Sequence, residues 1–249
     1  ITQQETTTTT RPQGTTTTTQ TVTINPVCYF DFSRGVREVS GKVSRWGNAF
    51  SGNSFSQTTD ANRPLLGLQG RGRVGFSPLF FYDDNTAFMS LNTAITLEDD
   101  FTIFIFIENI EIAGTRKYLR LLGKSDDNNM FISIGETANK SYVIGFDAST
   151  KTEINSTTTY WKPPTERVLI TLQRKGQKLF IRENGEALTS GTVSDNDFVF
   201  DQIGKKGNDT NATYNGGIYH LSIYDGYIEK GLEDIEDGIM REANAANHY

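Results

Sequence analysis

The sequence predicts an all-β protein: a two-sheet antiparallel jelly-roll sandwich with an extended N-terminal arm and a short C-terminal helix. From residue 26 onward, short apolar segments recur, mostly alternating with polar residues and separated by Gly, Asn and Asp turns. Residues 1–24 are Thr-rich and almost without apolar side chains, and an apolar stripe at helical spacing stands near the C-terminus. We therefore divide the chain into an arm, residues 1–24, and a jelly-roll domain, residues 25–249.

The arm contains two runs of five threonines that flank Arg11-Pro12-Gln13-Gly14. Threonine is β-branched and favours extended backbone, but the segment buries too little apolar surface to offset the entropy of ordering by itself. Its composition also fits a disordered linker or a mucin-like stalk. We expect an extended arm that pairs, as an added strand, with a neighbouring subunit or another protein. The contact residues assigned to it are Thr6, Thr10, Thr15 and Thr19.

The apolar segments are interpreted as strands in chain order. They lie at residues 27–32, 73–76, 88–91, 101–107, 118–122, 130–134, 142–146, 168–172, 178–181, 198–203 and 218–224. Residues 101–107 are dense enough in apolar side chains to predict a central strand. The segments 168–172 and 178–181 predict a hairpin with Lys175-Gly176 at its turn, and Asn184-Gly185 predicts another turn.

One helix is predicted near the C-terminus. Its apolar residues recur at spacings of four, three and four, and they are Ile228, Leu232, Ile235 and Ile239. The acidic residues assigned to the opposite face are Glu229, Glu233, Asp234 and Glu236. This amphipathic pattern predicts that the helix packs on an edge of the sandwich.

Composition excludes several classes of protein. The 249 residues carry a formal net charge of −6 and a pI of about 5.1, without the basic footprint of a nucleic-acid binder. One Cys and two His exclude an internal disulfide framework and a Cys/His zinc cluster. The densest apolar run, residues 101–107, is too short for a membrane-spanning helix.

Several motifs resemble the concanavalin A-like, laminin-G-like jelly-roll family. The stretch Val43-Ser44-Arg45-Trp46-Gly47-Asn48, then Ser51-Gly52-Asn53, then Asn62-Arg63-Pro64-Leu65-Leu66 is similar to a stretch found early in that domain, with Asn48 where Asp is commoner. Residues 166–185 resemble its strand, hairpin, strand and Asn-Gly unit, and residues 217–224 its ending. The resemblance covers residues 27–245. It implies a binding or assembly module of the kind found in phage structural and bacterial surface proteins.

No motif in the sequence identifies a set of catalytic residues, so we expect that the protein is not an enzyme. Glycan-cutting members of this fold place paired carboxylates on one strand face, whereas Glu108 and Glu111 are three residues apart and would face opposite sides. Cys28 lies between apolar neighbours and predicts a buried, inert thiol. His220 and His248 have no marked nucleophile partner. No Gly-rich loop follows a strand and opens a helix, so no nucleotide site is predicted.

We also expect no cofactor, with calcium as the alternative. Laminin-G-like modules sometimes bind Ca²⁺ through loop oxygens, and Ca²⁺ needs six to eight of them. Asp126 and Asp127 are the first candidates among the oxygen-rich loops, although short acidic loops are usually solvated turns.

A glycan site needs exposed aromatic rings beside hydrogen-bonding groups. The candidate platform residues, all in or near loops, are Tyr82, Tyr160, Trp161 and Tyr214. Covering the edge of the core is the competing role for Trp161, and it is the role expected for Trp46.

The function favoured by these observations is that of a non-enzymatic assembly protein of an extracellular particle. A phage virion accessory protein (capsid decoration or fibre), anchored at the virion surface by its arm and homo-oligomeric, is the preferred form. The alternative is a glycan-binding adhesin or receptor-binding module. A glycan-active enzyme is the third hypothesis. Neither nucleic acid nor membrane insertion is expected.

Overall fold

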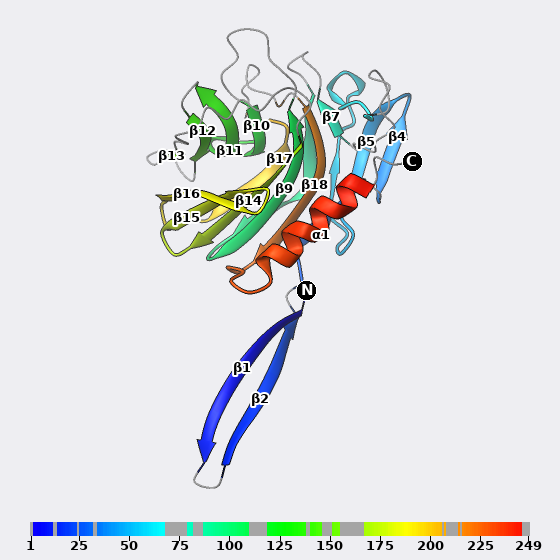
Figure 1. Cartoon of the computed structure of the whole chain (residues 1–249). Coiled ribbons are helices and arrows are strands. Elements are labelled where there is room, and N and C mark those ends of the chain that lie inside the picture. Colours follow the sequence, from blue (N-terminus) through cyan, green and yellow to red (C-terminus); the bar gives the residue numbers. More distant parts are fainter. Residues whose placement is uncertain are drawn as a thin grey trace.

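The fold is described from a computed structural model of the chain (Figure 1). The structure describes residues 2–11, 14–23, 25–31, 34–67, 79–81, 87–109, 119–137, 140–145, 151–154, 167–205, 207, 214 and 216–245. Within these ranges, side chains are described except at 2–23, 79–81, 109, 119, 134–137, 140–143, 151–154, 188–189 and 243–245.

Nearly all regular structure in the described ranges is β, as predicted. The strands are β1 (Thr2–Arg11), β2 (Gly14–Thr23), β3 (Cys28–Phe30), β4 (Val36–Val39), β5 (Lys42–Gly47), β6 (Ser54–Ser56), β7 (Leu79–Phe81), β8 (Met89–Leu97), β9 (Phe101–Asn109), β10 (Leu119–Lys124), β11 (Asp127–Thr137), β12 (Lys140–Gly145), β13 (Lys151–Ile154), β14 (Arg167–Lys175), β15 (Lys178–Glu183), β16 (Glu186–Thr192), β17 (Phe198–Ile203) and β18 (Gly216–Asp225). A 3₁₀ turn, η1 (Asp60–Asn62), follows β6, and the helix α1 (Leu232–Ala245) follows β18.

Two antiparallel sheets form the body. One has the order β13-β12-β11-β10-β17-β8-β6-β5-β4, and the other has β16-β15-β14-β9-β18-β3, with β7 also pairing with β18. Their inner faces enclose one apolar core, to which Trp46, Phe55, Phe198 and Phe200 contribute fully buried rings. Burying a large apolar side chain contributes roughly 1.5–3 kcal/mol, so this interior is the main source of stability. The body is a jelly-roll-like β-sandwich.

The seven-stranded sheet confirms the two strongest strand predictions. β9 lies between β14 and β18, and its inner residues Ile103, Ile105 and Ile107 enter the core between the sheets. β14 and β15 form the predicted hairpin, in which Lys175 pairs with Lys178. Gly176 at this turn has φ +56°, a left-handed conformation that glycine adopts without steric cost.

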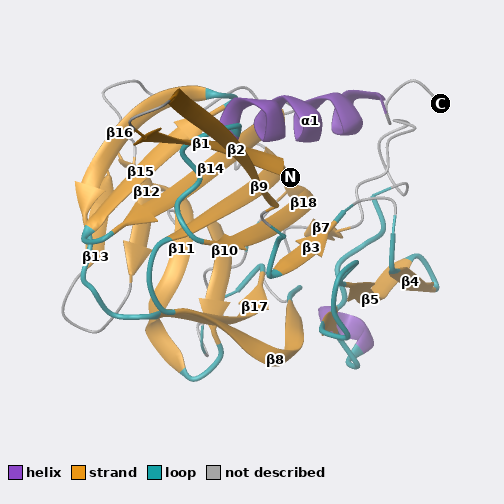
Figure 2. Cartoon of the chain, turned by 90° about the horizontal axis from the view of Figure 1, so that it is seen from below, coloured by secondary structure: helices purple, strands orange, loops and turns teal. Residues whose placement is uncertain are grey.

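Helix α1 covers the outer face of the seven-stranded sheet (Figure 2). It contacts β9 and β14, which lie inside the sheet, so the prediction that it packs on a sandwich edge is wrong. The reason is that the outer face is itself apolar. Phe104, Phe106, Leu169, Tyr219 and Tyr224 from the sheet pack with Ile228, Leu232, Ile235 and Ile239. The predicted helical stripe is therefore confirmed, with Ile228 just before the helix.

The arm forms a separate two-stranded sheet that projects from the body in Figure 1. Its backbone is extended, as expected, but β1 and β2 pair with each other, so that Thr6 lies opposite Thr19 and Thr10 opposite Thr15. Pairing of the arm with a neighbouring subunit stays a prediction.

Other strand predictions differ in detail. Residues 73–76 lie outside the described residues. The short strands β4, β5 and β6 were not expected, because polar residues interrupt their apolar ones. Among the described residues, no helix is long and apolar enough to cross a membrane.

Candidate functional site

An open pocket of about 730 Å³ lies between the outer face of the seven-stranded sheet and the start of α1. Strands β14, β15 and β16 form its floor, and the connection from β18 into α1 forms its wall. The floor residues are Gln173, Phe180, Ile181, Arg182, Ala187 and Ser190, and the wall residues are Tyr227, Ile228, Glu229, Gly231, Leu232, Glu233 and Asp234. We call this the helix-side pocket.

The floor follows from strand alternation and register. In β15, Leu179 and Ile181 are buried in the core between the sheets, whereas Phe180 stays half-buried. Phe180 lies opposite Gln173 on β14 and opposite Ser190 on β16. Because residues directly opposite each other share a face of the sheet, these three form a row across the pocket floor that combines one ring with two hydrogen-bonding side chains.

Two aromatic rings meet at the pocket. The centroids of Phe180 and Tyr227 lie 5.9 Å apart with an interplanar angle of 59°. Both residues are half-buried, so part of each remains accessible. The Lys175 ammonium nitrogen lies 4.7 Å from the Tyr227 ring centroid. The pocket therefore has an aromatic wall with a cation already beside it.

Hydrogen bonds from the sheet hold the connection that carries Tyr227. Gln173 Nε2 donates to the Ile228 carbonyl oxygen at 2.7 Å. Thr102 Oγ1 donates to the Gly226 carbonyl oxygen at 3.0 Å and accepts from the Ile228 N–H at 3.2 Å. Both residues that flank Tyr227 are thus fixed to the sheet, which sets the position of the ring.

A buried ion pair fixes the start of α1 above the floor. Glu236 is 1% exposed and accepts hydrogen bonds from Thr171 Oγ1 at 2.7 Å and Arg182 Nε at 3.0 Å. Arg182 Nη2 also donates to the Gly185 carbonyl oxygen. Removing one partner of such a pair costs about 3–5 kcal/mol, because a charge is left buried and unpaired. The sequence-based assignment of Glu236 to the exposed helix face is therefore wrong.

Carboxylates line the pocket wall. Glu229, Glu233 and Asp234 are exposed, and Glu233 lies 3.8 Å from Arg182 Nη2. Glu233 and Asp234 stand in the first turn of α1, where negative charge is favoured by the helix dipole. Glu229 precedes the helix and lies outside that first turn. Glu229 therefore adds negative charge to the wall at a position that the helix dipole does not account for.

The predicted aromatic platform is not confirmed. Tyr82, Tyr160 and Trp161 lie outside the described residues. Tyr214 is 1% exposed and its hydroxyl donates to the Glu108 carbonyl oxygen at 3.2 Å, so it belongs to the core and cannot stack on a ligand. Trp46 is fully buried and its Nε1 donates to the Asp31 carbonyl oxygen at 2.8 Å, as its expected structural role requires.

The predicted calcium residues lie in the turn from β10 to β11. The Asp126 carboxylate lies 3.2 Å from Lys124 Nζ, and Asp127 Oδ1 accepts from the Asn129 N–H at 2.8 Å. Within the described part of the chain, no three His, Cys, Asp or Glu side chains gather as metal ligands. Calcium binding at this turn stays a prediction.

Of the residues considered for nucleophilic catalysis, Cys28 and His220 are buried, and His248 lies outside the described residues. Cys28 is fully buried, as expected, and burial raises the pKa of its thiol. His220 is 2% exposed, its Nε2 lies 2.8 Å from Ser222 Oγ, and burial lowers the pKa of its imidazole to about 4. Its ring packs edge-on against Tyr29 at 4.9 Å. Neither residue faces the helix-side pocket.

The carboxylates considered for glycan hydrolysis are not seen as a pair. The Glu108 carboxylate accepts a hydrogen bond from the Tyr219 hydroxyl and lies 3.4 Å from Arg167 Nε. Burial, and then this contact with Glu108, raises the pKa of Tyr219. Glu111 lies outside the described residues. The expectation that the chain is not an enzyme stays a prediction.

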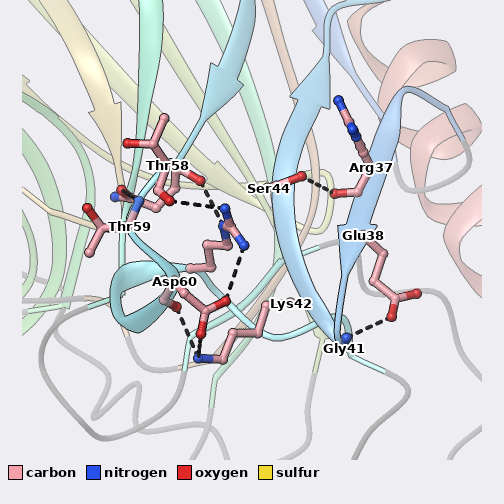
Figure 3. A network of polar contacts seen from close by, with 10 residues as sticks. Arg37, Glu38, Gly41, Lys42, Ser44, Thr58, Thr59 and Asp60 are labelled. Carbon is pink, nitrogen blue, oxygen red and sulfur yellow. Dashed lines mark hydrogen bonds and ion pairs between the residues drawn. The ribbon is translucent and has the colours of Figure 1, made fainter.

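Arg63, from the stretch that resembles the jelly-roll family, braces the segment that contains Thr58 and Asp60. Figure 3 shows Thr58, Asp60 and Lys42 in this network. Arg63 donates to the carbonyl oxygens of Gln57 at 2.9 Å and Thr58 at 3.0 Å, and to Asp60 Oδ1 at 3.1 Å. Lys42 Nζ donates to Asp60 Oδ2 at 2.9 Å, and this hydrogen bond is the main cause of the lowered pKa of the Asp60 carboxyl. These groups hold η1 against β5.

Sequence reasoning missed the helix-side pocket. Phe180 has the spacing of an outward-facing strand residue, and Tyr227 directly precedes the helical stripe. Their positions could have been noted separately, but nothing in the sequence shows that β15 and the β18–α1 connection lie side by side.

No protein-family model matches the chain, and no curated protein matches it. Among solved structures, the botulinum neurotoxin type G receptor-binding domain has a TM-score of 0.54 at 12% identity, covering 88% of this chain and 51% of that one. A complex of Trypanosoma rangeli sialidase has a TM-score of 0.52 at 9% identity, covering 90% of this chain and 33% of that one. A mutant of that sialidase with trans-sialidase activity has a TM-score of 0.54 at 12% identity, covering 86% of this chain and 32% of that one.

The chain thus spans about half of the toxin domain and about a third of the sialidases. At these identities the likeness concerns backbone architecture. The chain has a jelly-roll-like β-sandwich fold in common with these proteins.

Proposed function

We propose that the chain is a non-enzymatic glycan-binding module and that the helix-side pocket is its binding site. The observation that carries the proposal is the accessible Phe180–Tyr227 ring pair beside hydrogen-bonding groups in an open cavity of about 730 Å³. Ligand sites combine apolar and aromatic walls with a few polar groups that orient the ligand. A sugar ring offers an apolar face for stacking and hydroxyls for hydrogen bonds, which suits this combination.

The positions of the carboxylates support the non-enzymatic part of the proposal. Glu236 is held by Thr171 and Arg182 at the helix–sheet interface. The remaining carboxylates of the pocket are exposed and all stand on its wall, whereas glycosidases place two carboxyl groups on either side of the bond that they cut. The solved structures support the proposal at the level of fold, since one of them is a receptor-binding domain.

A glycan array followed by calorimetry tests this proposal. We expect Tyr227→Ala to weaken saccharide binding on the order of tenfold, which corresponds to about 1.4 kcal/mol for a lost aromatic contact. Phe50→Ala is the matched control, because Phe50 is 61% exposed and packs against Tyr29 of β3, at the opposite end of the sheet from β15. An equal loss in both variants, or no saccharide bound at all, contradicts the proposal. Release of reducing ends from a bound saccharide contradicts its non-enzymatic part.

A second candidate is assembly through the arm, favoured by the projecting β1–β2 hairpin. Within the described residues these strands pair only with each other, so each leaves one edge without strand partners. Such edges are templates for strand addition, and an isolated two-stranded hairpin is marginally stable. A subunit of an extracellular particle, such as a virion decoration or fibre protein, would use the edges in this way.

Sedimentation of the full chain tests this candidate. Thr17→Lys with Thr19→Lys places two positive charges along β2, and charge on an edge strand opposes pairing. We expect these substitutions to turn an oligomer into a monomer. A wild-type chain that is monomeric at all concentrations contradicts assembly through copies of itself.

A further inference from the structure

We propose that the saccharide taken by the helix-side pocket carries a protonated amine, so that the ligand class is an amino sugar polymer with free rather than acetylated amines. This inference rests on the proposed glycan-binding function and specifies the ligand class of the same pocket. It depends on the distribution of charge around the pocket and on the aromatic ring that faces it.

Negative charge prevails among the residues that line the pocket. Glu229, Glu233 and Asp234 are exposed carboxylates of the wall. Arg182 is the cationic side chain among the described lining residues, and its guanidinium is shared with the buried Glu236. Lys230 follows Glu229 but does not line the pocket. A ligand therefore meets three carboxylates, of which Glu233 lies 3.8 Å from Arg182 Nη2, while Lys175 places one positive charge beside Tyr227. Negative charge is still in excess.

The dipole of α1 reduces this negative charge without reversing it. The N-terminus of a helix contributes roughly half a positive charge, and Glu233 and Asp234 stand within its reach. Glu229 adds a carboxylate outside the helix. A carboxylated or sulfated sugar would thus be repelled from the wall, whereas an ammonium group would be attracted to it.

Tyr227 offers an independent reason to expect a cation. The chain's own Lys175 ammonium lies 4.7 Å from the centroid of this ring. An aromatic face attracts ammonium groups through its quadrupole. The contact shows that the Tyr227 ring is oriented so that a cation can approach it at the pocket rim. An amino sugar can place an apolar ring face on Phe180 and its ammonium between Tyr227 and the wall carboxylates.

The charge of a free amine distinguishes an amino sugar from its N-acetylated form. A free amine on the sugar is positively charged below its pKa and donates hydrogen bonds to carboxylates, which are the stronger kind when both partners are ionised. Acetylation removes that charge and keeps the sugar ring. The matched pair of a glucosamine hexamer and an N-acetylglucosamine hexamer therefore isolates the contribution of charge.

Calorimetry with the full chain at mildly acidic pH and low salt is the experiment. We expect the glucosamine hexamer to bind about tenfold more tightly than the acetylated hexamer, and this preference to fall with added salt. Glu229→Gln and Asp234→Asn should each weaken glucosamine binding several-fold. Lys175→Gln should strengthen it, because a like charge leaves the rim. Asp197→Asn, in an exposed loop, is the charge-matched control and should change nothing.

The outcomes separate the two proposals. If both hexamers bind equally and the wall variants have no effect, the amine inference is overturned while glycan binding stands. If neither hexamer nor any array saccharide binds, the proposed function fails. If spermidine binds as tightly as the glucosamine hexamer, the pocket recognises an ammonium group without a sugar, and the saccharide class is overturned.

Discussion

The two faces of the seven-stranded sheet are built differently. The inner face contributes Ile103 and Ile105 to the core between the sheets, to which the other sheet contributes side chains such as Phe200 of β17. The outer face meets α1 through a smaller apolar cluster plus directional polar contacts, among them the Glu236–Arg182 ion pair and the Gln173–Ile228 hydrogen bond. Apolar packing is non-directional, whereas these bonds set positions. The inner face therefore stabilises the body, and the outer face positions the pocket.

The largest effect is expected in the core that the inner face encloses with the other sheet. Phe200→Ala removes a fully buried ring, and such truncations cost about 3–5 kcal/mol through lost transfer energy and a residual cavity. Urea unfolding measures this loss, and any surviving folded protein should bind saccharide with unchanged affinity. A selective loss of binding in the folded fraction would show that the two faces are coupled.

At the outer face, we expect a loss of stability that a second substitution reverses. Arg182→Met leaves Glu236 buried without its cation and should cost about 3 kcal/mol, at the lower end because the Arg182 side chain is 17% exposed. Adding Glu236→Leu should recover most of that stability, since apolar replacement of a buried pair is often neutral. A double variant as unstable as the single one contradicts the assigned role of this pair.

Acid should destabilise the outer face near its β3 end. Burial lowers the pKa of His220 to about 4 in the folded state, below the ordinary value of 6.5. The unfolded chain therefore binds a proton first, and stability complete above about pH 6.5 is lost as pH falls toward 4. The loss should approach about 3 kcal/mol. The urea unfolding midpoint of the wild type should fall as pH is lowered through this range, and that of His220→Gln should fall less. An equal pH dependence in both proteins contradicts the assignment of the effect to His220.

The smallest effect on stability should accompany a large effect on binding. Gln173→Leu removes the hydrogen bond to the Ile228 carbonyl and should cost about 1 kcal/mol of stability. Because that bond positions the connection beside Tyr227, saccharide affinity should fall several-fold. Gln57→Leu, which removes a hydrogen bond of the same kind to the Phe88 carbonyl oxygen outside the pocket lining, is the control. Unchanged affinity in Gln173→Leu would mean that the bond does not position the ring.

Local patterns predicted the parts of the fold that depend on neighbours in sequence. The density of residues 101–107 identified the central strand β9, and Lys175-Gly176 marked the β14–β15 turn. The spacing of Leu232, Ile235 and Ile239 identified α1. The burial of Cys28 followed from its apolar neighbours, whereas the structural role of Trp46 was implied by the family resemblance.

Features that depend on tertiary placement were not predictable in this way. Glu236 lies beside the apolar stripe of α1 and would be solvated unless Arg182 approached from β15. Tyr214 stands in a sequence typical of a loop, yet it fills the core. Phe180 and Tyr227 form the pocket only because β15 and the β18–α1 connection meet in space. A single sequence carries no signal for such long-range contacts.

Chemical-shift mapping of the ¹⁵N-labelled full chain during titration with the glucosamine hexamer tests whether the helix-side pocket is the binding site. We predict that the perturbed amides cluster on the pocket floor around Phe180 and Ser190 and along residues 227–234. Perturbations confined to Tyr82, Tyr160, Trp161 and their neighbours in sequence, with none at residues 227–234, would contradict it.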